Sequence, residues 1–390
     1  MKRLALVFIL FALCAGFVFS SDFGFLLDQN AEAEDKYYSY TPAFVPWFSW
    51  HNKQGMSVYF SGILSLKYNN YDDNISDNDG LRKPIVLPEL SRFSFTYRSG
   101  QRSFEAGRVE YADALGQTAS GLFDGLRFQT ASPIGNISIG AFYTGLLYKE
   151  TAKILMTGND ALEYAKPVES FDDYRASKRS LAFGRLDIPL FEYHNFIFEA
   201  LAQFDMNGND EKLNSQYAQI ALELFAKNNT KLSGGFVFET MENKDGDFTA
   251  AYGAIAVIET DVPGSLNDSF ILTAKYSSGP RDETFTGFIP LSSITQGMIF
   301  SGTFTGLWQA KIGYAVRLLP SLFAETNASY FGRTYNEIGS DGSRYGGEVW
   351  ASLAWQPLED VRATLGGGVF LPETGDVYPW KINAGLSLSF

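Results

Sequence analysis

The sequence predicts an all-β protein, specifically a transmembrane antiparallel up-and-down β-barrel of about 16–18 strands. Segments of about ten residues, in which apolar and polar side chains alternate, recur along the chain. Aromatic residues make up 16% of the 390 residues, yet the mean hydropathy is only −0.09. Beyond the N-terminal segment, no apolar run approaches the roughly 20 residues that a membrane helix needs. A barrel wall gives this near-neutral average because lipid-facing and lumen-facing residues alternate.

Residues 1–20 are predicted to be a secretory signal peptide, because basic residues after the initial Met precede a long apolar run. We expect cleavage after Ser20. Cys14 is the only cysteine, so the mature chain is expected to have neither thiols nor disulfides. Lipidation of Cys14 is the alternative, but Leu13 is too large for the position before such a cysteine.

The remaining residues, 21–390, are predicted to form a single barrel domain. The clearest alternation lies in YAQIALELFAK, residues 217–227, where Ala218, Ile220 and Leu222 oppose Gln219 and Glu223. Short connectors alternate with long ones, which predicts short periplasmic turns on one rim and long extracellular loops on the other. The long connectors are expected near residues 70–90, 112–121, 149–178, 207–213, 242–247, 277–298, 334–344 and 372–379.

The segment 21–55 leaves the strand count open between 16 and 18. It can supply two further strands, because aromatic and small polar residues alternate in YSYTPAFVPWFSW. It can instead be a periplasmic N-terminal segment, since Pro42 and Pro46 each lack a backbone donor for a sheet.

Composition excludes several functions. The 44 acidic and 31 basic residues give a net charge of −13, which disfavours nucleic-acid binding. The two histidines, His51 and His194, fall in expected turns, and no nucleophile lies at a motif spacing from either. The chain has a single cysteine, and its two histidines do not form a metal-binding pair. The sequence therefore predicts neither an enzyme nor a metal site, and no cofactor.

Charged residues on the polar faces of the strands are expected to line a hydrophilic pore. In two strands the alternation shifts near a glycine, Gly107 or Gly184, and a β-bulge there would aim the following arginine inward. Such charges can also pair with one another merely to fill the barrel. The pore-lining candidates are Arg92, Arg98, Arg102, Arg108, Arg127, Arg185, Glu110 and Asp187.

The longest expected loop, residues 149–178, carries an apolar cluster that a solvated loop would not need. Folding inward would bury this cluster and bring Glu163, Glu169, Asp172 and Asp173 towards the lumen. These acids would then form a constriction opposite the arginines. The alternative is an external lid or a partner-binding surface.

The chain ends in a strand with apolar residues at every second position up to the terminal aromatic, which are Ile382, Ala384, Leu386, Leu388 and Phe390. This pattern resembles the C-terminal signature of bacterial outer-membrane β-barrels of the porin type. The resemblance implies that Phe390, Leu388 and Leu386 are an assembly signal read by the barrel-assembly machinery. Residues 106–128 are also similar to a segment of monomeric substrate-channel porins, such as alginate-export types.

Together these features predict a porin of the Gram-negative-type cell outer membrane, in contact with lipid and monomeric or trimeric. We expect a passive diffusion channel for small hydrophilic solutes or ions. A surface-exposed structural or adhesin-type protein with a closed lumen is one alternative. A hydrophobic-substrate transporter is another.

Overall fold

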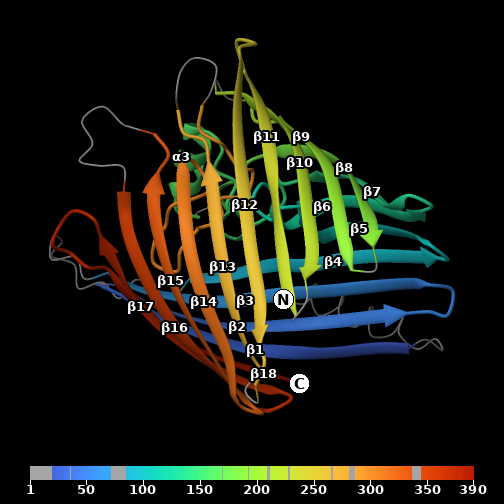
Figure 1. Cartoon of the computed structure of the whole chain (residues 1–390). Helices are drawn as coiled ribbons and strands as arrows, with labels where there is room; N and C mark the ends of the chain where they lie inside the picture. The colour runs from blue at the N-terminus through green and yellow to red at the C-terminus, as the bar shows by residue number, and fades with distance from the viewer. Residues whose placement is uncertain are drawn as a thin grey trace.

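The computed structural model describes residues 20–35, 37–71, 85–168, 170–191, 193–208, 211–226, 229–264, 267–280, 286–335 and 344–390. The predicted signal peptide, apart from Ser20, lies outside these residues. The described residues form an 18-stranded antiparallel sheet (Figure 1). The first nine strands are β1 Ser20–Glu34, β2 Tyr37–His51, β3 Met56–Tyr71, β4 Ile85–Ser99, β5 Arg102–Ala112, β6 Ser120–Ser132, β7 Gly135–Tyr143, β8 Arg179–Phe191 and β9 His194–Asp205. The others are β10 Leu213–Ala226, β11 Thr230–Asn243, β12 Phe248–Val262, β13 Asp268–Ser277, β14 Leu307–Leu319, β15 Leu322–Arg333, β16 Arg344–Leu358, β17 Val361–Pro372 and β18 Trp380–Ser389.

Each strand pairs with the next, and β18 pairs with β1, so the sheet closes into a barrel. The closing register runs from Leu26 opposite Ser389 to Glu34 opposite Lys381. The predicted up-and-down barrel is therefore confirmed, at the upper of the two expected strand counts. Closure removes a free sheet edge, which a bilayer would leave without hydrogen-bond partners.

The prolines of β2 are accommodated by local gaps in one ladder. β2 pairs with β1 without interruption from Tyr37 to His51. Its pairing with β3 skips residues 41–42 and 45–46, the positions around Pro42 and Pro46. Because proline has no N–H, each is tolerated where its missing donor faces the interrupted ladder.

Side chains along a strand alternate between an exposed outer face and a buried inner face, as β10 shows. On β10, Ser215, Tyr217 and Gln219 are almost fully buried, whereas Ile220 and Leu222 are exposed. Strictly alternating burial of this kind is expected when one face of a strand meets lipid and the other a lumen. Among the described residues, no helix is long and apolar enough to cross a lipid bilayer.

The two rims differ in the length of their connectors. One rim carries short turns, such as residues 100–101 between β4 and β5 and 320–321 between β14 and β15. The opposite rim carries the longest connectors, residues 144–178 between β7 and β8 and residues 278–306 between β13 and β14. This alternation agrees with the predicted arrangement of turns and loops.

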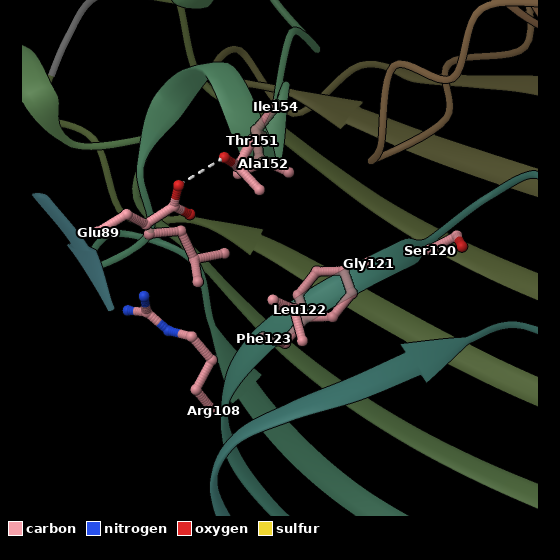
Figure 2. A pocket seen from close by; sticks show the side chains of 10 residues that line it. Glu89, Arg108, Ser120, Gly121, Leu122, Phe123, Thr151, Ala152 and Ile154 are labelled. Carbon is pink, nitrogen blue, oxygen red and sulfur yellow. Dashed lines mark hydrogen bonds between the residues drawn. The ribbon is translucent and has the colours of Figure 1, made fainter. Parts of the chain in front are cut away.

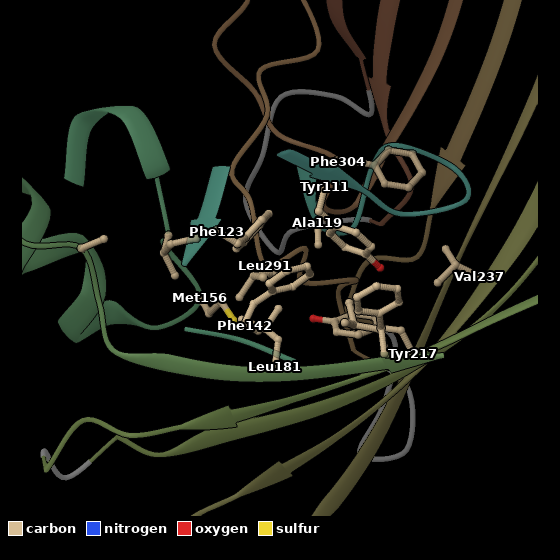
Figure 3. Packing of buried hydrophobic residues seen from close by; sticks show 14 of the residues in the cluster. Tyr111, Ala119, Phe123, Phe142, Met156, Leu181, Tyr217, Val237, Leu291 and Phe304 are labelled. Atoms are coloured by element: carbon tan, nitrogen blue, oxygen red, sulfur yellow. The ribbon is translucent and has the colours of Figure 1, made fainter. Parts of the chain in front are cut away.

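The lumen contains an apolar core, which the sequence interpretation of a wholly polar interior missed. Loop residues pack there against the inner wall of β5–β12 (Figure 3). The wall contributes Val109, Tyr111, Phe123, Phe142, Leu181, Phe183, Leu201, Tyr217, Val237, Met241 and Ala251, and the loops contribute Ala119, Leu147, Ile154, Met156, Ala176, Phe288, Leu291 and Phe304. Three loops are therefore folded into the barrel and held by hydrophobic burial.

Candidate functional site

The loop between β7 and β8 contains three short helices, α2 Lys149–Ala152, α3 Gly158–Ala165 and α4 Phe171–Tyr174. Ile154 and Met156 of this loop are 3% and 5% exposed within the lumen core. Leu162, by contrast, is 66% exposed. The loop thus turns part of its expected apolar cluster towards the barrel wall.

A buried ion-pair network fixes this loop to the wall. Arg179, the first residue of β8, contacts Asp160 of α3 at 2.5 Å and Asp205 at the end of β9 at 3.0 Å. Asp160 also closes a capping box with Thr157 at the start of α3. Because all three charged side chains are buried, each needs the others to offset its desolvation.

The loop between β13 and β14 is held by carboxylates of the inner wall. Glu239 of β11 accepts a hydrogen bond from the backbone N–H of Ile289 at 2.9 Å. Glu348 of β16 accepts three backbone N–H groups, those of residues 298, 299 and 300, at 2.8–2.9 Å. Charge-assisted acceptance of several N–H groups holds a loop tip in one position.

The loop between β5 and β6, residues 113–119, is anchored in the same way. Glu199 of β9 accepts the N–H of Ala114 at 2.7 Å and the hydroxyl of Tyr111. Asp113 accepts the N–H groups of residues 115, 118 and 119. Burial raises the pKa of Asp113, and these backbone donors oppose that shift.

The three inward loops contact one another and form a single body, which we call the lumen plug. The N–H of Ser292 donates to the carbonyl of Thr118 at 3.1 Å. The N–H of Ser293 donates to the carbonyl of Lys153 at 2.9 Å. The plug consists of residues 113–119, 144–178 and 278–306 as far as the structure describes them.

Several predicted arginines do line the inner wall, and each has a carboxylate partner there. Glu105 of β5 lies between Arg127, at 2.5 Å, and Arg92, at 3.8 Å. Arg185 contacts Asp187 at 2.8 Å, and both share the inward face of β8 with residues of the lumen core. Cations and acids thus alternate along β4, β5, β6 and β8.

The remaining predicted pore-lining residues differ in the sheet face that they occupy. Arg98 is on the inward face but at the exposed turn end of β4, and Arg102 begins β5 on the opposite face, shared with Phe104. Glu110 is exposed and lies on the outer face of β5, whereas its neighbour Val109 lies on the inner face. Its backbone carbonyl, rather than its carboxylate, accepts from Arg127.

Arg108 is buried, but in the wall and not in the pore. It forms a two-bond ion pair with Asp124 of β6, both bonds at 2.8 Å. Its Cα shares a sheet face with Phe93, which is exposed on the outer surface. The expected bulges are absent, since the ladders through Gly107 and Gly184 stay in register within these fully described segments.

The structure does not bring the predicted loop acids to the arginines. Glu163 contacts Lys166 within α3, and Asp172 contacts Arg175 beside α4. Asp173 caps the start of α4 through Ser170. Glu169 lies outside the described residues. The acid that does cross from the loop to a wall cation is Glu150, at 2.9 Å from Lys67 of β3.

The sequence did not predict the anchoring role of five residues, which are Asp160, Arg179, Glu199, Glu239 and Glu348. Only Asp160 left a local signal, because Thr157 and Asp160 have the spacing of a capping box. The others sit at ordinary inward positions of their strands. In the described part of the chain, no group of three or more His, Cys, Asp or Glu side chains could hold a metal ion.

The closed 18-stranded sheet with loops folded into its lumen defines a porin-type outer-membrane barrel fold. Solved structures of three other proteins, two of them from Pseudomonas aeruginosa, share this fold. OpdK with vanillate matches with a TM-score of 0.65 and 12% identity, over 95% of this chain and 98% of that chain. OccK5 (OpdH) matches with a TM-score of 0.63 and 11% identity over 95% and 98%. A variant of OccD1 (OprD) matches with a TM-score of 0.59 and 13% identity over 96% of both chains. No protein-family model and no curated protein sequence matches the chain.

Proposed function

We propose that the protein is an outer-membrane porin, a passive diffusion channel for small hydrophilic solutes or ions. The proposal rests on the solvent-accessible part of the inner wall, which lies beside the plug. Inward-facing charged side chains there keep substantial exposure, 40% for Arg92 and 32% for both Lys67 and Glu32. A charged, water-accessible wall favours polar solutes over apolar ones.

The channel wall in this proposal comprises Arg92, Arg98, Arg127, Arg185 and Asp187. Since Arg102, Arg108 and Glu110 lie on the other sheet face, we leave them out of the pore. The lumen plug takes the place of the constriction that was expected from the loop acids. Small carboxylates are the first solutes to assay, because the solved OpdK structure contains vanillate and this wall offers guanidinium groups.

Planar-bilayer recording of the purified, refolded protein tests the proposal. We expect discrete single-channel steps, and swelling of proteoliposomes in small hydrophilic solutes. A folded barrel that produces no conductance would instead favour the surface-exposed protein with a closed lumen. The protein-free bilayer and a heat-denatured sample serve as controls.

A further inference from the structure

The barrel wall has a seam between β4 and β5. These strands pair only from Ser99 opposite Arg102 to Phe93 opposite Arg108. Beyond that point β4 continues to Ile85 in pairing with β3, and β5 continues to Ala112 in pairing with β6. The described residues 85–92 and 109–112 thus form no ladder with each other. The seam lies in the half of the wall nearest the long loops.

Among the described residues, side chains and not a neighbouring strand donate to two carbonyls on this edge of β4. Pro88 lies on this edge, where the lack of an N–H costs nothing. Its carbonyl accepts from the hydroxyl of Tyr174 at 3.2 Å, and the carbonyl of Leu90 accepts from the guanidinium of Arg108. The side chains of Tyr174 and Arg108 therefore cover this edge, as side chains or loops cover the edges of open sheets in other proteins.

The loop between β7 and β8 fills the seam. The guanidinium of Arg108 donates to the carbonyl of Leu146 at 3.0 Å. The hydroxyl of Thr151 donates to Glu89 of β4 at 3.1 Å (Figure 2). A few side-chain contacts close this part of the wall, where the β4–β5 ladder has ended. Such a segment can open locally without unfolding of the barrel.

Apolar side chains lie beside the seam and beneath it. Leu90 and Leu146 are 40% and 54% exposed beside it. A pocket in the seam is lined by Phe123, Leu147 and Ile154, together with Glu89 and Arg108 from the two separated strands (Figure 2). Phe123, Leu147 and Ile154 all belong to the buried lumen core.

We propose that the β4–β5 seam is a lateral passage that admits a slender alkyl chain from the bilayer to the lumen core. The β7–β8 loop is its latch, held by Tyr174, Thr151 and Arg108. The passage does not rest on the proposed diffusion function, because that function uses the wet part of the lumen. The chain can belong to a free fatty acid or to a membrane phospholipid.

Single cysteines at Leu147 and Leu291 test the passage, because both are buried leucines of the plug but only Leu147 lines the seam. Each variant is reconstituted in phosphatidylcholine vesicles and treated with a long-chain alkyl maleimide that partitions into the bilayer. We expect Leu147→Cys to react roughly tenfold faster than Leu291→Cys, since its exposure needs only local opening. Equal rates would overturn the proposal. Ile154→Cys replaces Leu147→Cys if the latter does not fold.

Two photoreactive probes distinguish the sources of the chain. A diazirine fatty acid and phosphatidylcholine carrying the same diazirine chain are each incorporated with the unmodified protein. Labelling of residues 147–154 by the fatty acid alone identifies free amphiphiles, and labelling by both identifies lipid chains as well. No labelling by either probe contradicts the passage.

The latch is tested with Tyr174→Phe in the Leu147→Cys background. Removing the hydroxyl that bonds to Pro88 should increase the alkylation rate several-fold. Tyr40→Phe is the matched control, because the hydroxyl of Tyr40 bonds to Gln29 across strands that remain paired. If Tyr174→Phe leaves the rate unchanged, the loop is not the latch.

Discussion

Individual buried charges in this barrel hold loops in place. Arg179, Glu199, Glu239 and Glu348 all point inward, yet they contact loop segments and not open water. A charge buried without a partner would be costly, so each of these wall residues specifies where a loop must lie. A charge on the lumen face is therefore not by itself a pore residue.

Arg179→Met is expected to destabilise the barrel by about 3–5 kcal/mol, because Asp160 and Asp205 would then be buried beside each other without a cation. Thermal unfolding of the detergent-solubilised protein, followed by loss of β-sheet circular dichroism, measures the effect. Arg102→Met is the control, since Arg102 is exposed at a turn. Equal midpoints for the two variants would show that the network does not stabilise the fold.

Arg127→Gln is expected to shift the ion preference towards cations. Glu105 lies 2.5 Å from Arg127 but 3.8 Å from Arg92, so the substitution leaves the carboxylate less compensated. The reversal potential in a salt gradient across a planar bilayer reports the shift. Arg102→Gln makes the same change of charge on the other sheet face and should leave the potential unaltered. Equal shifts in both variants would remove Arg127 from the conduction path.

At the scale of the element, strands were predictable from sequence and loop positions were not. The alternation in residues 217–227 depends only on the two environments of a strand, so it is visible in one segment alone. The paths of the plug loops depend on partners far away in sequence, such as Glu348 for residues 298–300. The apolar cluster in residues 149–178 was the one local sign of an inward loop.

The β7–β8 loop provides a test at this scale. Replacing residues 153–174 by a short Gly-Ser linker removes Ile154, Met156 and the anchor Asp160 from the lumen, so we expect higher single-channel conductance. The fold should survive, because Arg179 keeps Asp205 as its partner at 3.0 Å. Deleting the exposed residues 374–377 between β17 and β18 is the control and should not alter conductance. Unchanged conductance in both variants would place the β7–β8 loop outside the conduction path.

At the scale of the whole molecule, the sequence predicted a closed barrel but left its strand count open. Pro42 and Pro46 argued against a strand because a single sequence does not show which neighbour a backbone group faces. In the barrel their interrupted positions face β3 alone, while β1 remains fully paired with β2. Pairing with both neighbouring strands makes residues 37–51 a strand, although the local sequence did not distinguish a strand from a periplasmic tail.

Phe390 contributes to the junction between the first and last strands. Phe390 exchanges two backbone hydrogen bonds with Phe25, at 2.9 and 3.0 Å, and their rings stack with centroids 4.9 Å apart. In the same β1–β18 junction, Leu386 pairs with Gln29 and Leu388 pairs with Leu27. The terminal aromatic therefore completes the junction between the first and last strands, where an open edge would be exposed to lipid.

Deleting Phe390 should reduce the amount of folded barrel in the outer membrane without changing the conductance of the molecules that do fold. The truncated chain loses two backbone hydrogen bonds and an aromatic contact at the β1–β18 junction, but it loses no group in the lumen. Heat-modifiable migration on gels measures the folded fraction, and planar-bilayer recording measures the channel. Phe323→Ala is the matched control, because Phe323 is an exposed outer-face aromatic away from the closing strands. Normal folded levels after deletion of Phe390, or an equal loss in the control, would contradict a specific role of the terminal residue in assembly.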